Sequence, residues 1–418
     1  MARGRATRVL AGFPGGIAPR SGDLYSGDTL SFPMASDNYG RIDGWRDELT
    51  EWRRDFHRHP ELAFEEERTS QIVTERLRSF GIEEVHHGIA RTGVVATIRA
   101  GSSDRAVALR ADMDALPIHE RNQFGHCSTS PGKMHACGHD GHTAMLLGAA
   151  RYLAQTRNFD GTVQLIFQPA EEKDGGAGVM VREGLFERFP ADKVFGLHNF
   201  PGVPTGAFAT NSGPFMAAID QFEIEIRGRG THGAWPHSGI DPIVAASQVV
   251  LGLQTLVSRN VDPRRRAVVS VTMSHAGEAF NVIPETAYLA GGVRSFLREV
   301  QDTLELGLER VVHGICAAHG ASAKVDYQRY YPATVNALRE TEEMAAAARS
   351  MGWEVDAEME PLMGSDDFAF LAEERPGSFM MIGNGDSEML HTPRYDFNDE
   401  LLTIGAKYWA RLAESQLS

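Results

Sequence analysis

The chain has 418 residues, which is too many for one compact hydrophobic core, so we expect two domains. Its 42% hydrophobic and 23% charged residues are typical of a soluble globular protein. The formal net charge of −15 and the lack of a basic stripe argue against nucleic acid as a partner, because phosphate binding needs clustered Lys and Arg. No apolar run approaches the roughly 18 residues of a membrane span, so we expect no membrane association.

The cysteine content and the first residues bear on where the protein works. Three scattered cysteines, an odd number in a long chain, argue for a reducing compartment and predict a cytoplasmic protein. Residues 1–40 differ in composition from the rest, but Pro14 cuts their apolar run short, which argues against a secretory signal. A transit peptide remains an alternative. We favour a disordered extension, or a true start at Met34.

The part from residue 41 to 215 alternates between helical and strand patterns. Helical periodicity begins near Gly44 and resumes from Glu66 to Phe80. Buried strands are predicted at residues 105–110, 162–167 and 193–197, with a helix at 143–155. This alternation predicts an α/β domain with a largely parallel sheet.

Polar residues follow each of these three strands. Asp112 and Asp114 come after the first, Glu171 and Glu172 after the second, and His198 after the third. In open α/β sheets, sites form beyond the carboxyl ends of the strands. We therefore expect these side chains to converge, although each one taken alone is as well explained as a solvated acid or a buried histidine.

The segment 134–142, Met-His-Ala-Cys-Gly-His-Asp-Gly-His, is the most informative stretch of the chain. It places Cys137 beside His135, His139 and His142 in a protein that is poor in cysteine. A thiolate and neutral imidazoles are the ligands that borderline-soft divalent metals prefer. The segment predicts a metal site, and an adjacent pair of acids such as Glu171 and Glu172 suits one, since one carboxylate binds metal while the other serves as general base.

Residues 216–329 have a different pattern, which predicts a second domain inserted into the first. Residues 222–226 alternate as a half-exposed strand does, and the elements that follow give the order β-α-β-β-α-β of a ferredoxin-like unit. The loop at residues 228–237 contains His232, and a hairpin with incidental histidines explains that loop equally well. Residues 330–418 are expected to return to the first domain, with His391 near the end.

These motifs together resemble the aminoacylase/hippurate hydrolase branch of the aminoacylase–acetylornithine deacetylase metallopeptidase superfamily. The likeness runs from about Arg41 to the C-terminus. It rests on seven spaced motifs in one order, at residues 109–117, 134–142, 167–172, 196–199, 228–237, 280–284 and 363–368.

The resemblance implies a zinc-peptidase-like catalytic domain with an inserted ferredoxin-like α+β domain that acts as lid and dimerisation domain. It implies two divalent metal ions per subunit, zinc or manganese before cobalt or nickel. Their ligands would be Cys137, His139, Glu172, His198 and His391.

The same resemblance assigns roles to the other site residues. Glu171 is the implied general base, and Asp114 supports the site behind the ligands, with Asp112 as a further candidate there. His232 is implied to reach the active site of a partner subunit in a homodimer or higher homo-oligomer. Asn281 and Arg294 are implied to lie near the substrate, with Arg294 on its carboxylate.

The reaction implied is hydrolysis of the amide bond of a small-molecule N-acyl amino acid by metal-activated water. One departure from the family pattern concerns the pocket: Lys173 and Asp174 separate the paired glutamates from the glycine-rich run that usually follows directly. A metallocarboxypeptidase or dipeptidase with the same site is the main alternative. A non-catalytic metal- or ligand-binding protein is less favoured, since binding alone needs no base.

Overall fold

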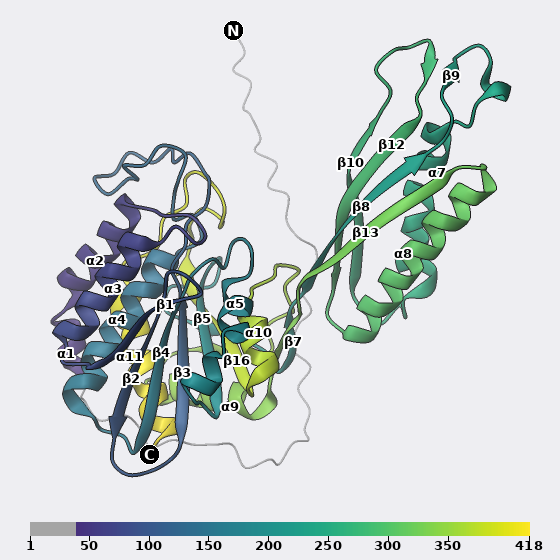
Figure 1. Ribbon diagram of the computed structural model, residues 1–418. Coiled ribbons are helices and arrows are strands. Elements are labelled where there is room, and N and C mark those ends of the chain that lie inside the picture. Colours follow the sequence, from purple (N-terminus) through teal and green to yellow (C-terminus); the bar gives the residue numbers. More distant parts are fainter. Residues whose placement is uncertain (1–38) are drawn as a thin grey trace, which may run out of the picture. The chain divides into compact units, whose positions relative to one another are not determined.

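The computed structural model describes residues 39–418 (Figure 1). The predicted extension therefore lies almost entirely outside the described residues, and so does the alternative start at Met34. Over the described range, no helix combines the length and the apolar character that crossing a membrane demands.

Eight strands in the described part of the chain form one large sheet, in the order β1-β2-β4-β3-β5-β16-β6-β15. The four neighbouring strands β4, β3, β5 and β16 run parallel to one another. This confirms the predicted α/β class with a mostly parallel sheet. The strands are β1 (Glu84–Ile89), β2 (Gly93–Ala100), β3 (Ala106–Asp112), β4 (Gly161–Gln168), β5 (Lys193–Pro201), β6 (Phe208–Ala209), β15 (Val355–Asp356) and β16 (Gly377–Gly385).

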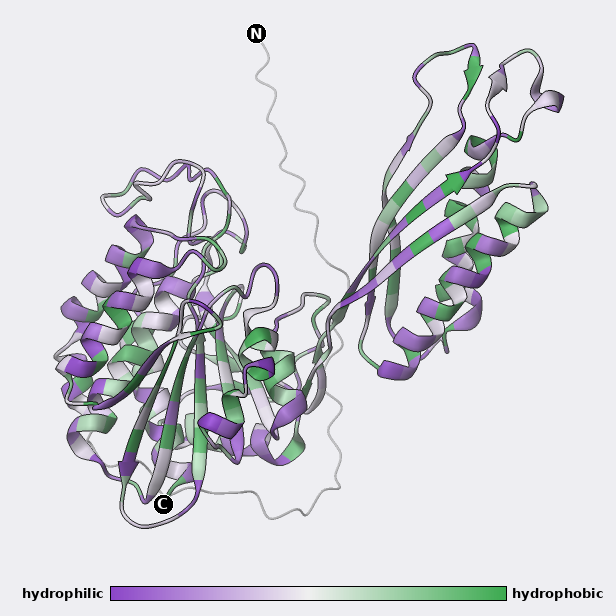
Figure 2. Cartoon of the chain, viewed as in Figure 1, coloured by the Kyte–Doolittle hydropathy of each residue, from purple (hydrophilic) through white to green (hydrophobic). Residues whose placement is uncertain are grey.

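Helices cover both faces of the large sheet because its central strands are apolar on both sides. In β3, Leu109 packs into one hydrophobic cluster and its neighbour Ala108 into the other. Figure 2 shows this in colour: the central strands are largely hydrophobic, and the outer surfaces of the helices around the sheet are largely hydrophilic. The first face carries α1 (Gly40–Asp43), α2 (Arg46–Arg58), α3 (Glu67–Ser79), α4 (His139–Thr156), α9 (Leu338–Ser350) and α11 (Leu401–Gln416); the second carries α5 (Gly176–Arg182), α6 (Leu185–Arg188) and α10 (Phe368–Glu374).

Several element boundaries differ from the sequence prediction, and two of these differences are explained by groups at the site. Strand β3 continues to Asp112, which pairs with Gln168, because Arg110 and His142 bind the buried carboxylate of Asp112. Helix α4 begins at His139 rather than at residue 143. Gly138 precedes it with a φ of 97°, a conformation that glycine adopts without strain.

The inserted region, which we define as β8 to β13, forms a second sheet in the order β10-β12-β8-β13. All its neighbouring strands are antiparallel, and this order is that of a ferredoxin-like unit. A third hydrophobic cluster joins this sheet to α7 and α8. The elements are β8 (Ala218–Arg227), β9 (Thr231–His232), α7 (Pro242–Thr255), β10 (Ala267–Ala276), β11 (Val282–Ile283), β12 (Thr286–Ser295), α8 (Arg298–Ala318) and β13 (Ser322–Tyr331).

The chain enters and leaves the inserted region through two paired strands. Strand β7 (Gly213–Met216) precedes the region and β14 (Thr334–Asn336) follows it. They are antiparallel neighbours, with Met216 opposite Thr334. After β14 the chain returns to the large sheet, first through β15 and then through β16.

Candidate metal centre and active site

The predicted ligands come from one strand, the loop after another strand, one helix start and one late loop. Cys137 and His139 flank Gly138 at the start of α4, and His198 lies on β5. No side chain fits at Gly138, because a Cβ atom there would lie 2.1 Å from the Asn199 Oδ1 atom. Close packing of α4 on β5 thus brings Cys137 within 3.4 Å of His198, measured from Sγ to Nε2.

The remaining ligands complete two overlapping groups. Cys137, Glu172 and His391 place ligand atoms within 4.8 Å of one another, and so do His139, Glu171 and Glu172. The His391 Nε2 atom lies 3.2 Å from Glu172 Oε1, and the His139 Nε2 atom lies 3.9 Å from the same oxygen. Glu172 therefore stands between the two groups, as a residue next to two metal ions would.

The loop that carries His391 is fixed to the cysteine loop. The backbone N–H of His391 donates to the Ala136 carbonyl at 2.8 Å. His391 itself has a φ of 61°, a left-handed conformation that is costly for a residue other than glycine. The surrounding contacts hold the strained backbone and keep this distant part of the chain beside Glu172.

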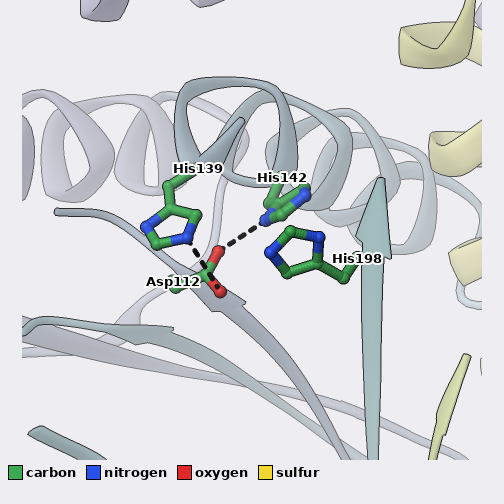
Figure 3. Close-up of side chains that lie close together, drawn as sticks. All are labelled: Asp112, His139, His142 and His198. Carbon is green, nitrogen blue, oxygen red and sulfur yellow. Dashed lines mark hydrogen bonds and ion pairs between the residues drawn. The ribbon is translucent and has the colours of Figure 1, made fainter. Parts of the chain in front are cut away.

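Asp112, His139, His142 and His198 form a further cluster (Figure 3), but its histidines are not equivalent. His142 donates from Nδ1 to Asp112 Oδ1 at 2.6 Å, while its Nε2 accepts the backbone N–H of Asn199 at 3.0 Å. Both ring nitrogens of His142 are therefore engaged by protein groups. His142 orients Asp112 and β5 instead of presenting a free nitrogen.

Two buried atoms among the predicted ligands have no hydrogen-bond partner in the described part of the chain. They are His139 Nε2 and Glu172 Oε1. A buried polar atom without a partner is costly, and a bound cation at this point would satisfy both. Burial also raises the pKa of the Cys137 thiol well above its ordinary value, and the carboxylates of Glu172 and Glu171 add to this. The donor set therefore fits divalent metal ions.

Asp114 organises both halves of the site. Its Oδ1 atom accepts the backbone N–H of Glu171 and its Oδ2 atom accepts that of Glu172, each at 3.0 Å. The same carboxylate lies 3.2 Å from His139 Nδ1, so it orients the imidazole through the nitrogen that faces away from Glu172. Asp114 thereby positions a ligand and the paired glutamates at once.

Glu171 occupies a buried and negatively charged environment. Burial is the largest effect that raises its pKa well above the ordinary value, followed by the charges of Asp366 and Glu172. Arg110, which is fully buried, makes ion pairs with Asp112, Asp366 and Asp367 at 2.7, 3.1 and 3.0 Å. One arginine does not balance so many carboxylates, which is a second reason why the site suits added cations.

A cavity of about 830 Å³ opens onto this cluster. Cys137, Glu171, Glu172, His198 and His391 line it, and so does Arg294 of the inserted region. The half-buried guanidinium of Arg294 donates to Ser365 Oγ at 2.5 Å; among the described residues it makes no ion pair with a carboxylate, although the charge of Asp220 acts on it. The structure therefore brings Arg294 to the same cavity as the predicted ligands.

His232 and Asn281 lie elsewhere. His232 is opposite Val282 in the β9–β11 ribbon, and the Gly233 N–H donates to the Asn281 carbonyl at 2.7 Å. Neither residue lines the cavity. Strand β8, which starts beside the cavity, is ten residues long, so the ribbon after it lies roughly 30 Å further along the strand direction.

Sequence reasoning missed several residues that support the site. Arg110 was part of a predicted buried strand and received no role, although a charge within an apolar run is itself a signal of a buried ion pair. Tyr331 lines the cavity and gave no such signal, and Asp366, which also lines it, belongs to the motif at residues 363–368 but received no role. Their positions depend on contacts between distant parts of the chain.

Known proteins resemble this chain over most of its length. Residues 108–415 match the model of Peptidase family M20/M25/M40. A hippurate hydrolase from Campylobacter jejuni is 42% identical over 88% of this chain and 96% of its own length. An N-acetylcysteine deacetylase from Bacillus subtilis is 41% identical over 87% of this chain and 96% of its own length.

Two further relatives bear on the metals and on the alternatives. Thermostable carboxypeptidase 1 from Saccharolobus solfataricus is 37% identical over 88% of this chain and 95% of its own length. A crystal structure from Bacillus subtilis, described as a dinuclear metal-binding peptidase, superposes with a TM-score of 0.80 at 37% identity. That likeness covers 90% of this chain and 99% of the other.

Proposed function

The chain belongs to Peptidase family M20/M25/M40, and we propose that it hydrolyses the amide bond of N-acyl amino acids with Glu171 as general base. The observation that carries the proposal is the pairing of Glu171 with Glu172 beside the orphaned nitrogen of His139. A protein that only bound metal would need no second buried carboxylate at this place.

Two divalent metal ions fit the residues present. Cys137, His139, Glu172, His198 and His391 would hold them, and Asp112 and Asp114 support these ligands from behind. The thiolate favours zinc, and manganese, cobalt and nickel also accept imidazole and carboxylate ligands. When bound, such ions supply Lewis acidity, which activates water and polarises the amide carbonyl.

Glu171 is placed to move the proton that hydrolysis requires. Its Oε2 atom lies 3.9 Å from His139 Nε2, and its side chain faces the cavity. A carboxylate with a raised pKa is a stronger base than an ordinary one, so it takes a proton from water more readily, and the same group then gives that proton to the departing amine. The backbone bond from Glu171 to Asp114 keeps this side chain at the edge of the ligand group.

Arg294 is the residue for the substrate carboxylate. A guanidinium that is half-buried without a carboxylate partner has lost part of its hydration and gains from a bound anion. Met216, Leu362 and Met381 line the same cavity and offer apolar contacts to the acyl group or the side chain. This arrangement suits a molecule with one carboxylate and one apolar end.

The inserted region provides the contact to a second subunit in this proposal. Trp235 and Phe280, which flank the His232 ribbon, are 59% and 104% exposed, and β10 is an edge strand of its sheet. Exposed aromatic side chains and a free strand edge suit self-association about a two-fold axis. His232 would then steady the developing oxyanion in the partner's site, with Asn281 beside the substrate there.

The first test compares Glu171→Gln with the wild type on hippurate and several N-acetyl amino acids, by release of free amine. We expect kcat to fall about 10²- to 10⁴-fold with metal content unchanged. Glu342→Gln, an exposed position on α9, is the matched control and should keep full activity. Near-normal turnover of Glu171→Gln with metal bound would contradict the role of Glu171.

A metallocarboxypeptidase or dipeptidase activity is the second candidate, because a relative at 37% identity is a carboxypeptidase. Arg294 would bind a peptide carboxylate equally well, so the site alone does not separate the two. Side-by-side turnover of N-acetyl amino acids and of dipeptides decides between them. Binding of both with turnover of neither would favour the non-catalytic alternative.

A further inference from the structure

A pair of tyrosines from the inserted region holds the loop that contains the paired glutamates. The Tyr331 hydroxyl donates to the Glu171 carbonyl at 2.7 Å and accepts the Gly175 N–H at 3.1 Å. The adjacent Tyr330 hydroxyl accepts the Asp174 N–H at 2.5 Å. Both tyrosines lie at the end of β13, whereas the loop follows β4 of the large sheet. The contact therefore crosses from one sheet to the other.

The loop between Ala170 and Gly175 needs such support because its backbone is strained. Ala170 and Asp174 have φ values of 55° and 68°, in the left-handed region that residues other than glycine rarely adopt. Gly175 is also left-handed at 63°, and a Cβ atom there would lie 3.0 Å from the Tyr331 ring. The Gly176 N–H donates to the Ala170 carbonyl at 2.9 Å and closes this turn, and within it the Tyr331 hydroxyl joins the Glu171 carbonyl to the Gly175 N–H. Without the hydroxyl, Asp114 would still hold the start of the loop, but nothing in the described residues would replace the bond to the Glu171 carbonyl.

Tyr331 also belongs to the same cross-strand row as Arg294. Ile219 of β8 is opposite Arg294 on one side and opposite Tyr331 on the other. Directly opposite residues in an antiparallel sheet point to the same face, and all three line the cavity. The residue proposed for the substrate carboxylate and the residue that holds the base loop are thus fixed to each other by hydrogen-bonded strands.

We propose that Tyr331 is a positioning residue that fixes Glu171 relative to Arg294, so that the inserted region sets the geometry of the base as well as that of the substrate. The inference rests on the proposed function of Glu171 and Arg294. Tyr331 acts through the backbone of Glu171. A small displacement of a base from its productive geometry is expensive, since about 1 Å of misplacement can lower a rate by roughly 10²-fold.

The test is Tyr331→Phe, which removes only the hydroxyl. We expect kcat to fall about 10- to 100-fold, with KM changed less than about 2-fold and metal content unchanged. Tyr327→Phe is the matched control, because Tyr327 lies on the same strand and its hydroxyl donates to Asp220 Oδ2 at 2.6 Å, away from the glutamate loop. The control should lower the melting temperature and leave kcat unchanged. Normal kcat in Tyr331→Phe, or an equal loss in Tyr327→Phe, overturns the inference.

A double-mutant cycle asks whether Tyr331 acts through Glu171. In a Glu171→Gln background, Tyr331→Phe should cause no further loss of kcat, because the group that it positions is absent. A loss as large as in the wild-type background would show that Tyr331 acts otherwise, and would overturn the inference.

One measurement is independent of turnover and separates failure of this inference from failure of the proposed function. Amide hydrogen exchange of the segment 171–175 should speed up in Tyr331→Phe and stay unchanged in Tyr327→Phe. Unchanged exchange in Tyr331→Phe overturns the inference even if the enzyme is active. A wild-type protein that is loaded with metal and releases no amine overturns the proposed function instead.

Discussion

The large sheet and the inserted region place their functional residues in opposite ways. At the large sheet, Asp112, Asp114 and His139 are at most 1% exposed, and each is held by several named contacts. In the inserted region, His232 and Asn281 are exposed on a two-stranded ribbon. The buried residues lie beside the candidate metal ligands, whereas His232 and Asn281 do not line the cavity onto which those ligands open. Under the proposed function, the buried residues act within one subunit, and the exposed residues act only when a second subunit brings its site to them.

Metal removal should have the largest effect on activity, and it concerns the candidate ligands at the large sheet and not the inserted region. Dialysis against a chelator should abolish amine release and lower the melting temperature, because an ion bound only by the folded state stabilises that state. Metal added back should restore both quantities. Full activity after the metal content has fallen to background, as measured by elemental analysis, would contradict the assignment of the five ligands.

His232→Ala changes a residue of the inserted region, and we expect it to cost less activity than metal removal does. We expect kcat to fall about 10²- to 10³-fold, as for the loss of one oxyanion donor, while metal content stays normal. Mixing unfolded His232→Ala and Glu171→Gln chains and refolding them together should restore part of the activity, because a mixed dimer has one site with both groups. Mixtures as inactive as the separate variants would show that His232 does not act across subunits.

Two matched core substitutions compare the regions by stability. Leu146 on α4 and Leu289 on β12 are both fully buried, and replacement by alanine should cost about 2–5 kcal/mol of unfolding free energy in each case. Leu146→Ala should also weaken metal binding, since α4 begins with His139. Leu289→Ala should leave metal affinity unchanged. A titration with a competing chelator measures the metal affinity of both variants. Equal losses of affinity in Leu146→Ala and Leu289→Ala would show that metal binding depends on both regions alike.

The pH dependence of stability gives the smallest effect and concerns Glu66 beneath the site. This carboxylate accepts the Ala170 N–H at 2.9 Å, and burial, followed by the charge of Asp114, raises its pKa to about 7. The folded state therefore holds a proton that the unfolded chain releases above about pH 4.5. The stabilising contribution is complete below that pH and is lost as the pH rises through 7.

Glu66→Gln should remove this dependence, because an amide stays neutral. We expect the melting temperature of the variant minus that of the wild type to be larger at pH 8 than at pH 5. A constant difference between these two pH values would mean that Glu66 is already ionised in the folded protein at pH 5.

The sequence predicted the α/β class and the convergence of Cys137, His139, Glu172 and His198, because local motifs at strand ends carry that information. The sequence did not predict the roles of side chains whose positions depend on contacts with distant parts of the chain. His142 belonged to the same motif, yet Asp112 and Asn199 occupy both its nitrogens, and only the register of β3 and β5 against α4 reveals that. Tyr331 gave no signal for the same reason, since its partner is 160 residues away.

The pairing of Met216 with Thr334 also bears on how such a protein can arise and change. Because the two ends of the inserted region are neighbours in one short ladder, a short turn between them would close the chain without rearranging the large sheet. An ancestor without the insertion is therefore a feasible fold, and a domain of another kind can be accommodated at the same junction. Under the proposed function, the inserted region can be exchanged during evolution while the candidate metal ligands stay in place, provided that its replacement supplies substitutes for Arg294 and Tyr331.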